Sequence, residues 1–170
     1  MSFRAIASEY GCSYSMPYSY FESKADLVDG LRFRVYAWLH DVLCEARDAT
    51  SDPVEALDAI AETYVASGLS RPRFYELLFS DAGALPEDDD ALVRAKLHAL
   101  HVCRDAIVDA ADHAGLTLTT DPDTAANLFW VAAHGLVSLE LGGFLVVGRT
   151  ATEILPQLFT TMTRGLTDPT

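Results

Sequence analysis

Residues 2–24 read SFRAIASEYGCSYSMPYSYFESK, and this stretch decides the fold. Apolar side chains recur at helical spacing in its first half, at Phe3, Ile6, Ala7 and Tyr10. Gly11 follows at once, and glycine readily ends a helix because it tolerates a left-handed backbone. Ser13 can then cap a second helix over residues 14–21. Two short helices joined by a glycine turn predict a helix-turn-helix unit, whose second helix enters the DNA major groove.

Three short segments of this stretch follow one another in a specific order: Phe3-Arg4-Ala5-Ile6-Ala7, then Gly11-Cys12-Ser13, then Tyr18-Ser19-Tyr20-Phe21 with Ser23-Lys24. Their order and spacing resemble the DNA-binding segment of tetracycline-repressor-like (TetR) transcription regulators. The resemblance implies that base edges face four residues: Tyr14, Ser15, Met16 and Ser19. It also implies that Tyr18, Tyr20 and Lys24 contact the DNA backbone, since hydroxyl and ammonium groups bond phosphate oxygens without reading sequence.

This segment departs from the family pattern in three ways. The family has a further helix before it, and the chain as given begins too late to include that helix. Pro17 stands where the family usually has leucine, and it removes one backbone hydrogen bond near the helix start. The groove-facing positions carry no Arg or Lys, so base reading would rely on hydroxyls, on Met16 and on DNA shape. The alternative is that the tyrosines only pack the small helical unit.

Composition separates a neutral head from an acidic body. The 170-residue chain has a net charge of −13, yet basic and acidic residues balance through Arg34. An acidic body argues against nucleic-acid binding over the whole surface. We therefore expect two domains: an incomplete helix-turn-helix head over residues 1–34 and an effector-binding and dimerisation domain over residues 35–170. Three cysteines without a C-x-x-C pair, and no apolar signal region, fit a cytoplasmic protein with reduced thiols.

Helix start signals are frequent and strand signals are nearly absent, which predicts an all-α fold. Ser23 with Asp26, Asp52-Pro53 and Asp121-Pro122 each begin a helix by capping. We expect helices over residues 24–47, 53–68, 71–82, 92–114, 124–147 and 152–166. The acidic run in residues 83–90 is interpreted as a solvated loop, and residues 117–120 as a linker.

The stretch over residues 128–147 is long enough to span a membrane. Glu140 near its middle would cost about 2.5–3.5 kcal/mol there, and His134 adds to that cost. We therefore expect a buried bundle helix and no membrane contact. Its small residues allow another helix to approach closely, and together with the last helix it predicts a four-helix dimer interface. The expected interface residues are Ala132, Gly135, Leu139, Gly142, Gly143, Leu155, Leu158, Phe159 and Met162.

Trp130-x-x-x-His134-Gly135 resembles the Trp/His-Gly pattern of one branch of TetR-like C-terminal domains, as does the helix beginning Arg71-Pro72. Aromatic and polar residues of the body suit a mostly apolar effector pocket: Trp38, Tyr64, Tyr75, His98, His101, Trp130 and His134. Inward aromatics are also ordinary core residues, and His134 can be a core histidine with one hydrogen-bond partner.

Other chemistry has little support in the sequence. His98 and His101 share a helix face, but Cys103 is turned away and no second motif completes a metal site. No nucleophile elbow, phosphate loop or dinucleotide fingerprint is present, so we expect no enzyme, no metal and no cofactor.

These observations predict a dimeric, ligand-responsive, DNA-binding transcription regulator, with repression as its expected mode. Its partners would be operator DNA, a small-molecule effector and a second copy of the chain. The alternative is a helical dimer that binds a small molecule or a protein and has lost DNA binding. The missing first helix and the uncharged reading face favour that alternative.

Overall fold

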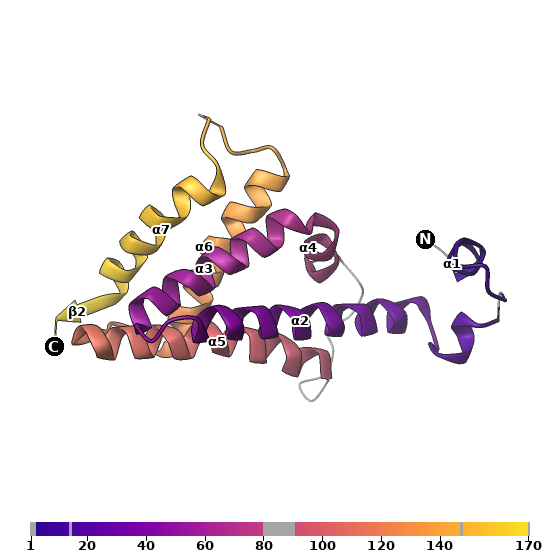
Figure 1. The fold of residues 1–170 in the computed structure, drawn as a ribbon, viewed down its shortest axis with the longest axis horizontal. Coiled ribbons are helices and arrows are strands. Elements are labelled where there is room, and N and C mark those ends of the chain that lie inside the picture. The colour runs from indigo at the N-terminus through magenta and orange to yellow at the C-terminus, as the bar shows by residue number, and fades with distance from the viewer. Residues whose placement is uncertain (1–2, 14, 80–90, 147, 170) are drawn as a thin grey trace.

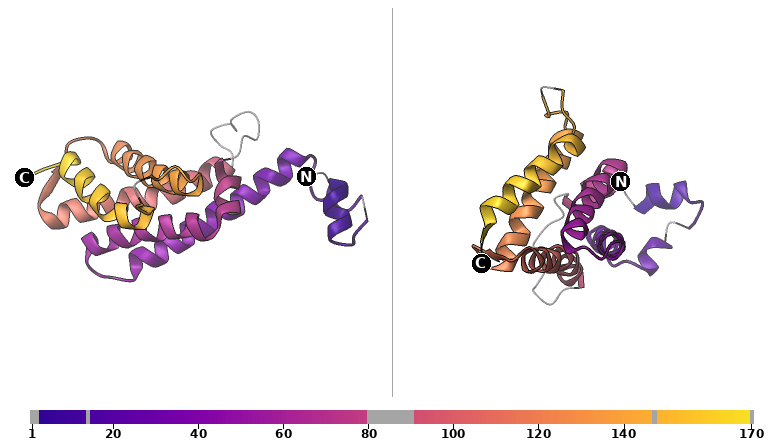
Figure 2. Two further views of the ribbon diagram at one scale, coloured as in Figure 1. Left: turned by 90° about the horizontal axis from the view of Figure 1, so that it is seen from above. Right: turned by 60° about the vertical axis from the view of Figure 1, so that its left-hand side comes forward.

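The computed structural model describes residues 3–13, 15–79, 91–146 and 148–169. In this part of the chain, helices follow one another with one short sheet among them: α1 (Phe3–Glu9), η1 (Pro17–Ser19), α2 (Lys24–Asp48), α3 (Pro53–Ser70), α4 (Pro72–Phe79), α5 (Ala91–Ala114), β1 (Leu116–Leu118), α6 (Pro122–Leu141), α7 (Ala151–Leu166) and β2 (Thr167–Pro169). The prediction of an all-α fold is confirmed. Two views show α1 and η1 projecting from the body at the start of α2 (Figures 1 and 2).

The glycine turn after α1 forms as predicted. Gly11 has a φ of +63°, the Cys12 amide donates to Ala7 O at 3.0 Å, and the Gly11 amide donates to Ser8 O at 3.4 Å. This pair of bonds is a Schellman motif, which satisfies the last carbonyls of a helix. The residues 2–24 stretch therefore begins with the helix and turn that its sequence indicates.

The second helix of the head, expected over residues 14–21, is wrong as an α-helix. The described residues there form only the short 3-10 helix η1. Pro17 explains the difference, because proline supplies no amide hydrogen and disfavours helical backbone in the preceding residue. Tyr14 lies outside the described residues.

Helix α2 runs from the head into the body and lies beside α5 (Figure 1). Its N-cap is Ser23, whose hydroxyl accepts from the Asp26 amide at 3.1 Å, while Asp26 accepts from the Glu22 amide at 2.9 Å. The capping signal is thus confirmed. Its buried residues Val35, Tyr36, Leu39 and Leu43 turn one face to the body.

Helices α3 and α6 begin at the predicted aspartate-proline pairs. Asp52 accepts from the Val54 amide at 2.8 Å, and Asp121 accepts from the Thr124 amide at 2.9 Å. Proline at the first helical position loses nothing there, since that amide has no partner within the helix. Helix α4 ends at Phe79, and the expected remainder of that helix and the acidic loop over residues 83–90 lie outside the described residues.

Helix α6 ends earlier than predicted. The predicted end at residue 147 is wrong, because Gly143 has a φ of +70° and forms a Schellman turn in which Phe144 N donates to Leu139 O at 2.8 Å. Gly142 and Gly143 therefore lie beyond the helix instead of on a helical stripe. Within the described ranges, none of the helices combines the length and the apolar character that crossing a bilayer requires.

Residues 117–120, expected as a linker, contribute instead to a two-stranded antiparallel sheet. Leu116 pairs with Pro169 and Leu118 with Thr167. Three-residue strands are too short to show a periodic pattern, and their partner is far away in the sequence. The sheet holds the end of α5 beside the end of α7.

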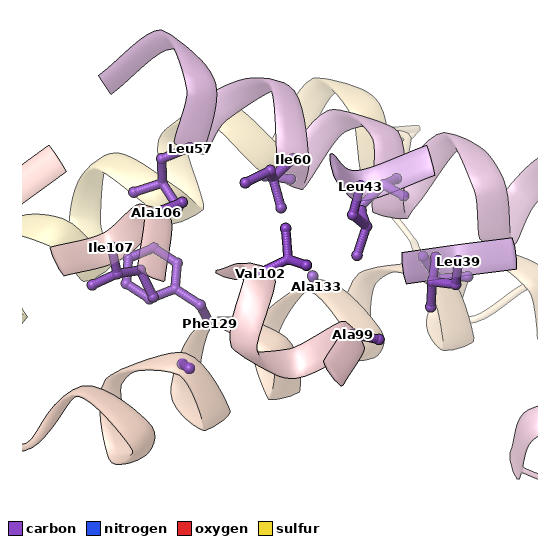
Figure 3. Close-up of a cluster of buried hydrophobic side chains, with 14 of the residues drawn as sticks. Leu39, Leu43, Leu57, Ile60, Ala99, Val102, Ala106, Ile107, Phe129 and Ala133 are labelled. Atoms are coloured by element: carbon purple, nitrogen blue, oxygen red, sulfur yellow. The ribbon is translucent and has the colours of Figure 1, made fainter. Parts of the chain in front are cut away.

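The core lies where α2, α3, α5 and α6 meet. Figure 3 shows Leu39 and Leu43 pointing toward α5 residues such as Val102, with Ile60 of α3 and Ala133 of α6 on the other sides. All of them are buried. Burying a Leu or Ile side chain contributes about 1.5–3 kcal/mol, so this layer holds the body together.

Candidate functional site

A cavity of about 260 Å³ opens within this helical body, lined from α2, α3, α5, α6 and α7. Most of its wall is hydrocarbon, from Leu39, Leu43, Ile60, Phe129, Ala133 and Phe159 among others. Its polar groups come from Tyr36, Tyr64, Lys96, Cys103, Asn127 and Trp130. Apolar walls with a few polar groups are typical of small-molecule sites.

Lys96 is the charged residue among the described residues that line the cavity. Its Nζ lies 5.8 Å from the centroid of the Tyr36 ring, near the outer limit of a cation–π contact. Lys96 extends from α5, whereas Tyr36 belongs to α2. The ammonium and the phenol therefore approach each other across the junction of these two helices.

The two tyrosines of the cavity are neutral. Burial raises the pKa of Tyr36 to about 12 and raises the pKa of Tyr64 further. The indole Nε1 of Trp130 donates to Tyr64 Oη at 3.1 Å, which links α6 to α3. Burial likewise raises the pKa of the Cys103 thiol to about 12, so this cysteine behaves as a small apolar group.

A second, smaller hollow of about 20 Å³ lies among α2, α3 and α4, and Trp38 and Tyr75 line it. That volume suits at most a single water molecule. The Arg71 guanidinium carbon lies 4.3 Å from the Trp38 ring centroid, and Phe74 packs edge-on against that ring. Trp38 therefore packs α4 against α2 and does not face the larger cavity.

His134 joins α6 to α4. Its Nδ1 lies 2.5 Å from Tyr75 Oη, its Nε2 lies 3.3 Å from Ser138 Oγ, and the Phe79 ring centroid is 4.2 Å away. Burial lowers the pKa of His134, which favours the neutral ring. This environment is that of a core histidine with hydrogen-bond partners.

The structure brings together some of the seven residues expected in an effector pocket and not others. Tyr64 and Trp130 line the cavity, and Tyr75 and His134 lie behind Trp130 in contact with each other. His98 is exposed, its ring centroid lies 6.3 Å from that of His40, and neither His98 nor His101 lines the cavity. Among the residues placed by the structure, no three His, Cys, Asp or Glu side chains gather as metal ligands would.

Periodicity alone did not identify Tyr36, Leu39, Leu43 or Lys96 as cavity residues. The first three recur at helical spacing on α2 and therefore look the same as ordinary core positions. For Lys96 the sequence offers one weak indication of a cavity position, because this lysine lies between Ala95 and Ala99, which are both buried residues of α5.

One polar contact connects α2 to α4 near the head. The buried Arg32 donates from Nε to Leu77 O at 3.0 Å, and its Nη1 lies 3.2 Å from Asp29. Leu77 lies near the end of the described part of α4. Helix α4 therefore contacts α2 through Arg32 and α6 through Tyr75.

The described residues expected to contact DNA are all exposed: Ser15, Met16, Tyr18, Ser19, Tyr20 and Lys24. Tyr18 and Tyr20 are 63% and 71% exposed, so these side chains are not the core of a packed unit. Arg4 and Lys24 are the basic residues of the described part of the head before α2 turns into the body.

The expected dimer face divides into outward and inward residues. Leu128, Val131 and Leu139 of α6 are exposed, and Ala132 and Gly135 between them are half-buried. Leu155 and Phe159 are instead buried in the protomer's own core, with Phe159 packed on Phe129. Leu158 and Met162 of α7 are half-buried. The exposed part of the expected dimer face is therefore formed mostly by residues of α6.

Comparisons with known proteins agree with this architecture. The family described as "Tetracyclin repressor-like, C-terminal domain" matches residues 57–166. The comparison with curated proteins finds no match. Among solved structures, a protein of unknown function from Rhodococcus sp. RHA1 is 24% identical and has a TM-score of 0.81, with 99% of this chain and 85% of that chain covered.

Two further structures share the fold. The transcriptional regulator FadR from Bacillus subtilis, solved in complex with stearoyl-CoA, has a TM-score of 0.79 at 11% identity, over 98% of this chain and 89% of that one. A TetR family transcription regulator from Marinobacter aquaeolei VT8 has a TM-score of 0.72 at 23% identity, over 99% and 85%.

The chain thus combines a small exposed head, a long connecting helix and a helical body that encloses a cavity. The family match covers more than half of the chain, and the chain belongs to the tetracycline-repressor-like family of transcription regulators. The predicted membership of this family is confirmed, and the matched residues include the Trp130 to Gly135 segment.

Proposed function

We propose that the protein is a ligand-responsive transcription regulator whose DNA affinity is set by a small molecule in the 260 Å³ cavity. One observation carries this proposal: α2 contributes Tyr36, Leu39 and Leu43 to the cavity wall and continues without a break to the head. A ligand that prefers one position of α2 would shift the head by its differential affinity for the two positions.

The contact between Arg32 and Leu77 O supports a second route for this coupling. The Trp130 ring contacts His134, His134 contacts Tyr75 of α4, and α4 contacts α2 through Arg32. A ligand that displaces Trp130 would therefore also act on α2 through this series of contacts. The relative from B. subtilis was solved with stearoyl-CoA, which is consistent with a small-molecule effector in this fold.

We propose further that two copies pair through the exposed face of α6 together with α7, as a four-helix interface. Two heads would then bind half-sites about 34–36 Å apart in successive major grooves of an operator. Tyr18, Tyr20 and Lys24 would hold phosphates, and Ser15, Met16 and Ser19, with Tyr14, would face the bases. This function implies a cytoplasmic repressor that a ligand releases from DNA.

A gel-shift titration at low salt tests DNA binding, with DNA from upstream of the gene as the probe. The wild-type chain should retain that DNA more strongly than the double variant Tyr18→Ala, Lys24→Ala. Each lost phosphate contact also lowers the salt dependence of binding. Equal retention of both proteins would contradict the proposed head contacts.

The second candidate is a dimeric helical module that binds a small molecule or a protein and no longer binds DNA. The scarcity of cations in the head and the 3-10 turn in place of a recognition helix favour it. It predicts ligand binding to the cavity with no DNA retention at any salt concentration. The same titration therefore distinguishes the two functions.

A further inference from the structure

We infer that the cavity binds a small amphiphilic monocarboxylate of about ten non-hydrogen atoms, with its carboxylate at Lys96 and Tyr36. The inference rests on the proposed function and specifies its effector by chemical class.

Size is the first constraint on the ligand. An apolar cavity of about 150 Å³ holds benzene, so a cavity of 260 Å³ holds roughly ten non-hydrogen atoms. An unbranched eight-carbon acid has this size.

Wall chemistry is the second constraint. Leu43, Ile60, Phe129 and Ala133 present only methyl groups and rings to the space. A sugar or a nucleotide would lose hydrogen bonds to water along these walls, at a cost of about 1–3 kcal/mol for each unsatisfied group. A hydrocarbon body gains from the same walls because it leaves water.

Charge is the third constraint. Lys96 lines the cavity, whereas none of the carboxylates that the structure describes does so, although the whole chain carries a net charge of −13. Among the described residues Lys96 forms no ion pair, and its Nζ lies 5.8 Å from the centroid of the Tyr36 ring. A ligand ammonium placed beside Lys96 would be repelled by it, whereas a carboxylate gains a charge-assisted hydrogen bond.

The position of Lys96 keeps the cost of burying this charge low. Lys96 is half-buried, and its neighbour Leu97 in the wall is 43% exposed, so solvent reaches this part of the cavity wall. A carboxylate beside it stays partly hydrated, which avoids most of the desolvation penalty of a fully buried ion pair. Tyr36 also lines the cavity, and its neutral hydroxyl offers a second hydrogen-bond donor from α2.

A carboxylate bound at Lys96 and Tyr36 would connect α5 to α2. Lys96 belongs to α5, which packs along α2, and Tyr36 belongs to α2 itself. A carboxylate bound to both side chains would stabilise one separation of α2 and α5. Contacts of the apolar tail with Leu39 and Leu43 are less directional and define this separation less sharply.

Calorimetric titration of the whole chain, without DNA, tests the inference with three ligands of matched size: octanoate, octanamide and octylamine. Octanoate should bind about tenfold or more tighter than octanamide, the value of one charge-assisted hydrogen bond. Octylamine should bind more weakly than either. The variant Lys96→Met should bind octanoate and octanamide alike, since methionine keeps the apolar stem and removes the charge.

Arg164→Met is the matched control, because Arg164 is an exposed cation of α7 outside the cavity wall. It should keep the preference for octanoate. Equal binding of octanoate and octanamide by the wild type, or an unchanged preference in Lys96→Met, would overturn the carboxylate assignment. Absence of binding by all three ligands would overturn it as well. Failure of the proposed function would appear elsewhere, as a lack of DNA retention by a protein that still binds octanoate.

Discussion

Gly68 lies on α3 where that helix meets α4 and α6. A Cβ built there would lie 2.7 Å from Val137 Cγ1 and 3.0 Å from the Tyr75 ring. Val137 and Tyr75 are buried, so neither can move aside freely. We expect Gly68→Ala to lower the free energy of unfolding by about 1–3 kcal/mol, the usual cost of overpacking. Urea unfolding at a fixed protomer concentration measures it.

Gly165→Ala is the control for this variant, because a Cβ at Gly165 of α7 meets nothing within 4 Å. Alanine is the better helix former by up to about 1 kcal/mol, so this variant should be as stable as the wild type or more stable. Equal losses in both variants would contradict the packing at Gly68.

His134 should make stability depend on pH. Burial lowers its pKa below the ordinary value of 6.5, so the unfolded chain binds a proton at a pH where the folded chain does not. Unfolding then takes up a proton, and stability falls as pH decreases from 6.5 toward the folded pKa. Above pH 6.5 the effect vanishes, because both states are neutral.

Unfolding of the wild type and of His134→Gln at pH 7.5 and pH 5.5 measures this contribution. We expect the wild type to lose more stability than the variant between the two values. Comparing the two proteins removes the effect of other groups, such as Asp58, whose pKa burial raises. A larger loss in the variant would show that protonated His134 stabilises the fold.

At the level of single residues, the sequence predicts the type of environment better than the role. Tyr64 and Trp130 were expected near a pocket, and they line the cavity and hydrogen-bond to each other. Glu140 was noted only for its cost in a membrane, yet it accepts a hydrogen bond from the Ala151 amide at the start of α7. That contact depends on where α6 ends, which local periodicity does not define.

Among the contacts between helices, we expect the loss of the hydrogen bond from Arg32 to Leu77 O to have the clearest effect on stability. Arg32→Met keeps an apolar stem but leaves Leu77 O without the Nε donor. A hydrogen bond from a charged donor contributes about 1.5–3 kcal/mol, so we expect a loss of that size in the free energy of unfolding. Hydrogen exchange should also rise in α4, since Arg32 holds its last turn against α2.

Arg34→Met is the matched control on the same helix, because Arg34 is exposed. Its effect should stay within about 0.5 kcal/mol. If the two variants are equally stable and α4 exchanges at the same rate in both, Arg32 does not connect α4 to α2.

Helix starts were more predictable than helix ends. Ser23, Asp52 and Asp121 hydrogen-bond to amides two or three residues ahead, so a short local pattern contains the whole signal. The end of α6 depended on which of several glycines adopts a positive φ, and Gly143 does so before Gly148 is reached. The pairing of β1 with β2 required contacts between distant segments.

For the whole molecule, the decisive test concerns the outward face of α6. Val131 is 59% exposed beside Gly135, at the centre of the face proposed to pair with a second copy. Val131→Glu would place two charges opposite each other in that interface, and an unpaired buried charge is strongly destabilising. Light scattering should show a dimer for the wild type and a mass of one protomer for the variant.

Val54→Glu makes the same change at another exposed valine, at the start of α3, and should leave the dimer intact. A single-protomer mass for the wild type itself would contradict the proposed pairing.

The all-α class and the family were predictable from sequence because helix signals and the head motif are local. The cavity was predictable only in part, through Tyr64 and Trp130, since its wall results from how five helices pack.

The carboxylate of Glu140 binds the first amide of the following helix across the hairpin between α6 and α7, and Thr150 and Glu153 cap the same helix end reciprocally. These bonds hold the start of α7 against the end of α6. In the proposed dimer, this pair of helices would be the fixed part of each protomer. A ligand-driven tilt of α2 near Tyr36 would then displace the exposed tyrosines of the head further than Tyr36 itself, because they lie beyond the far end of that helix.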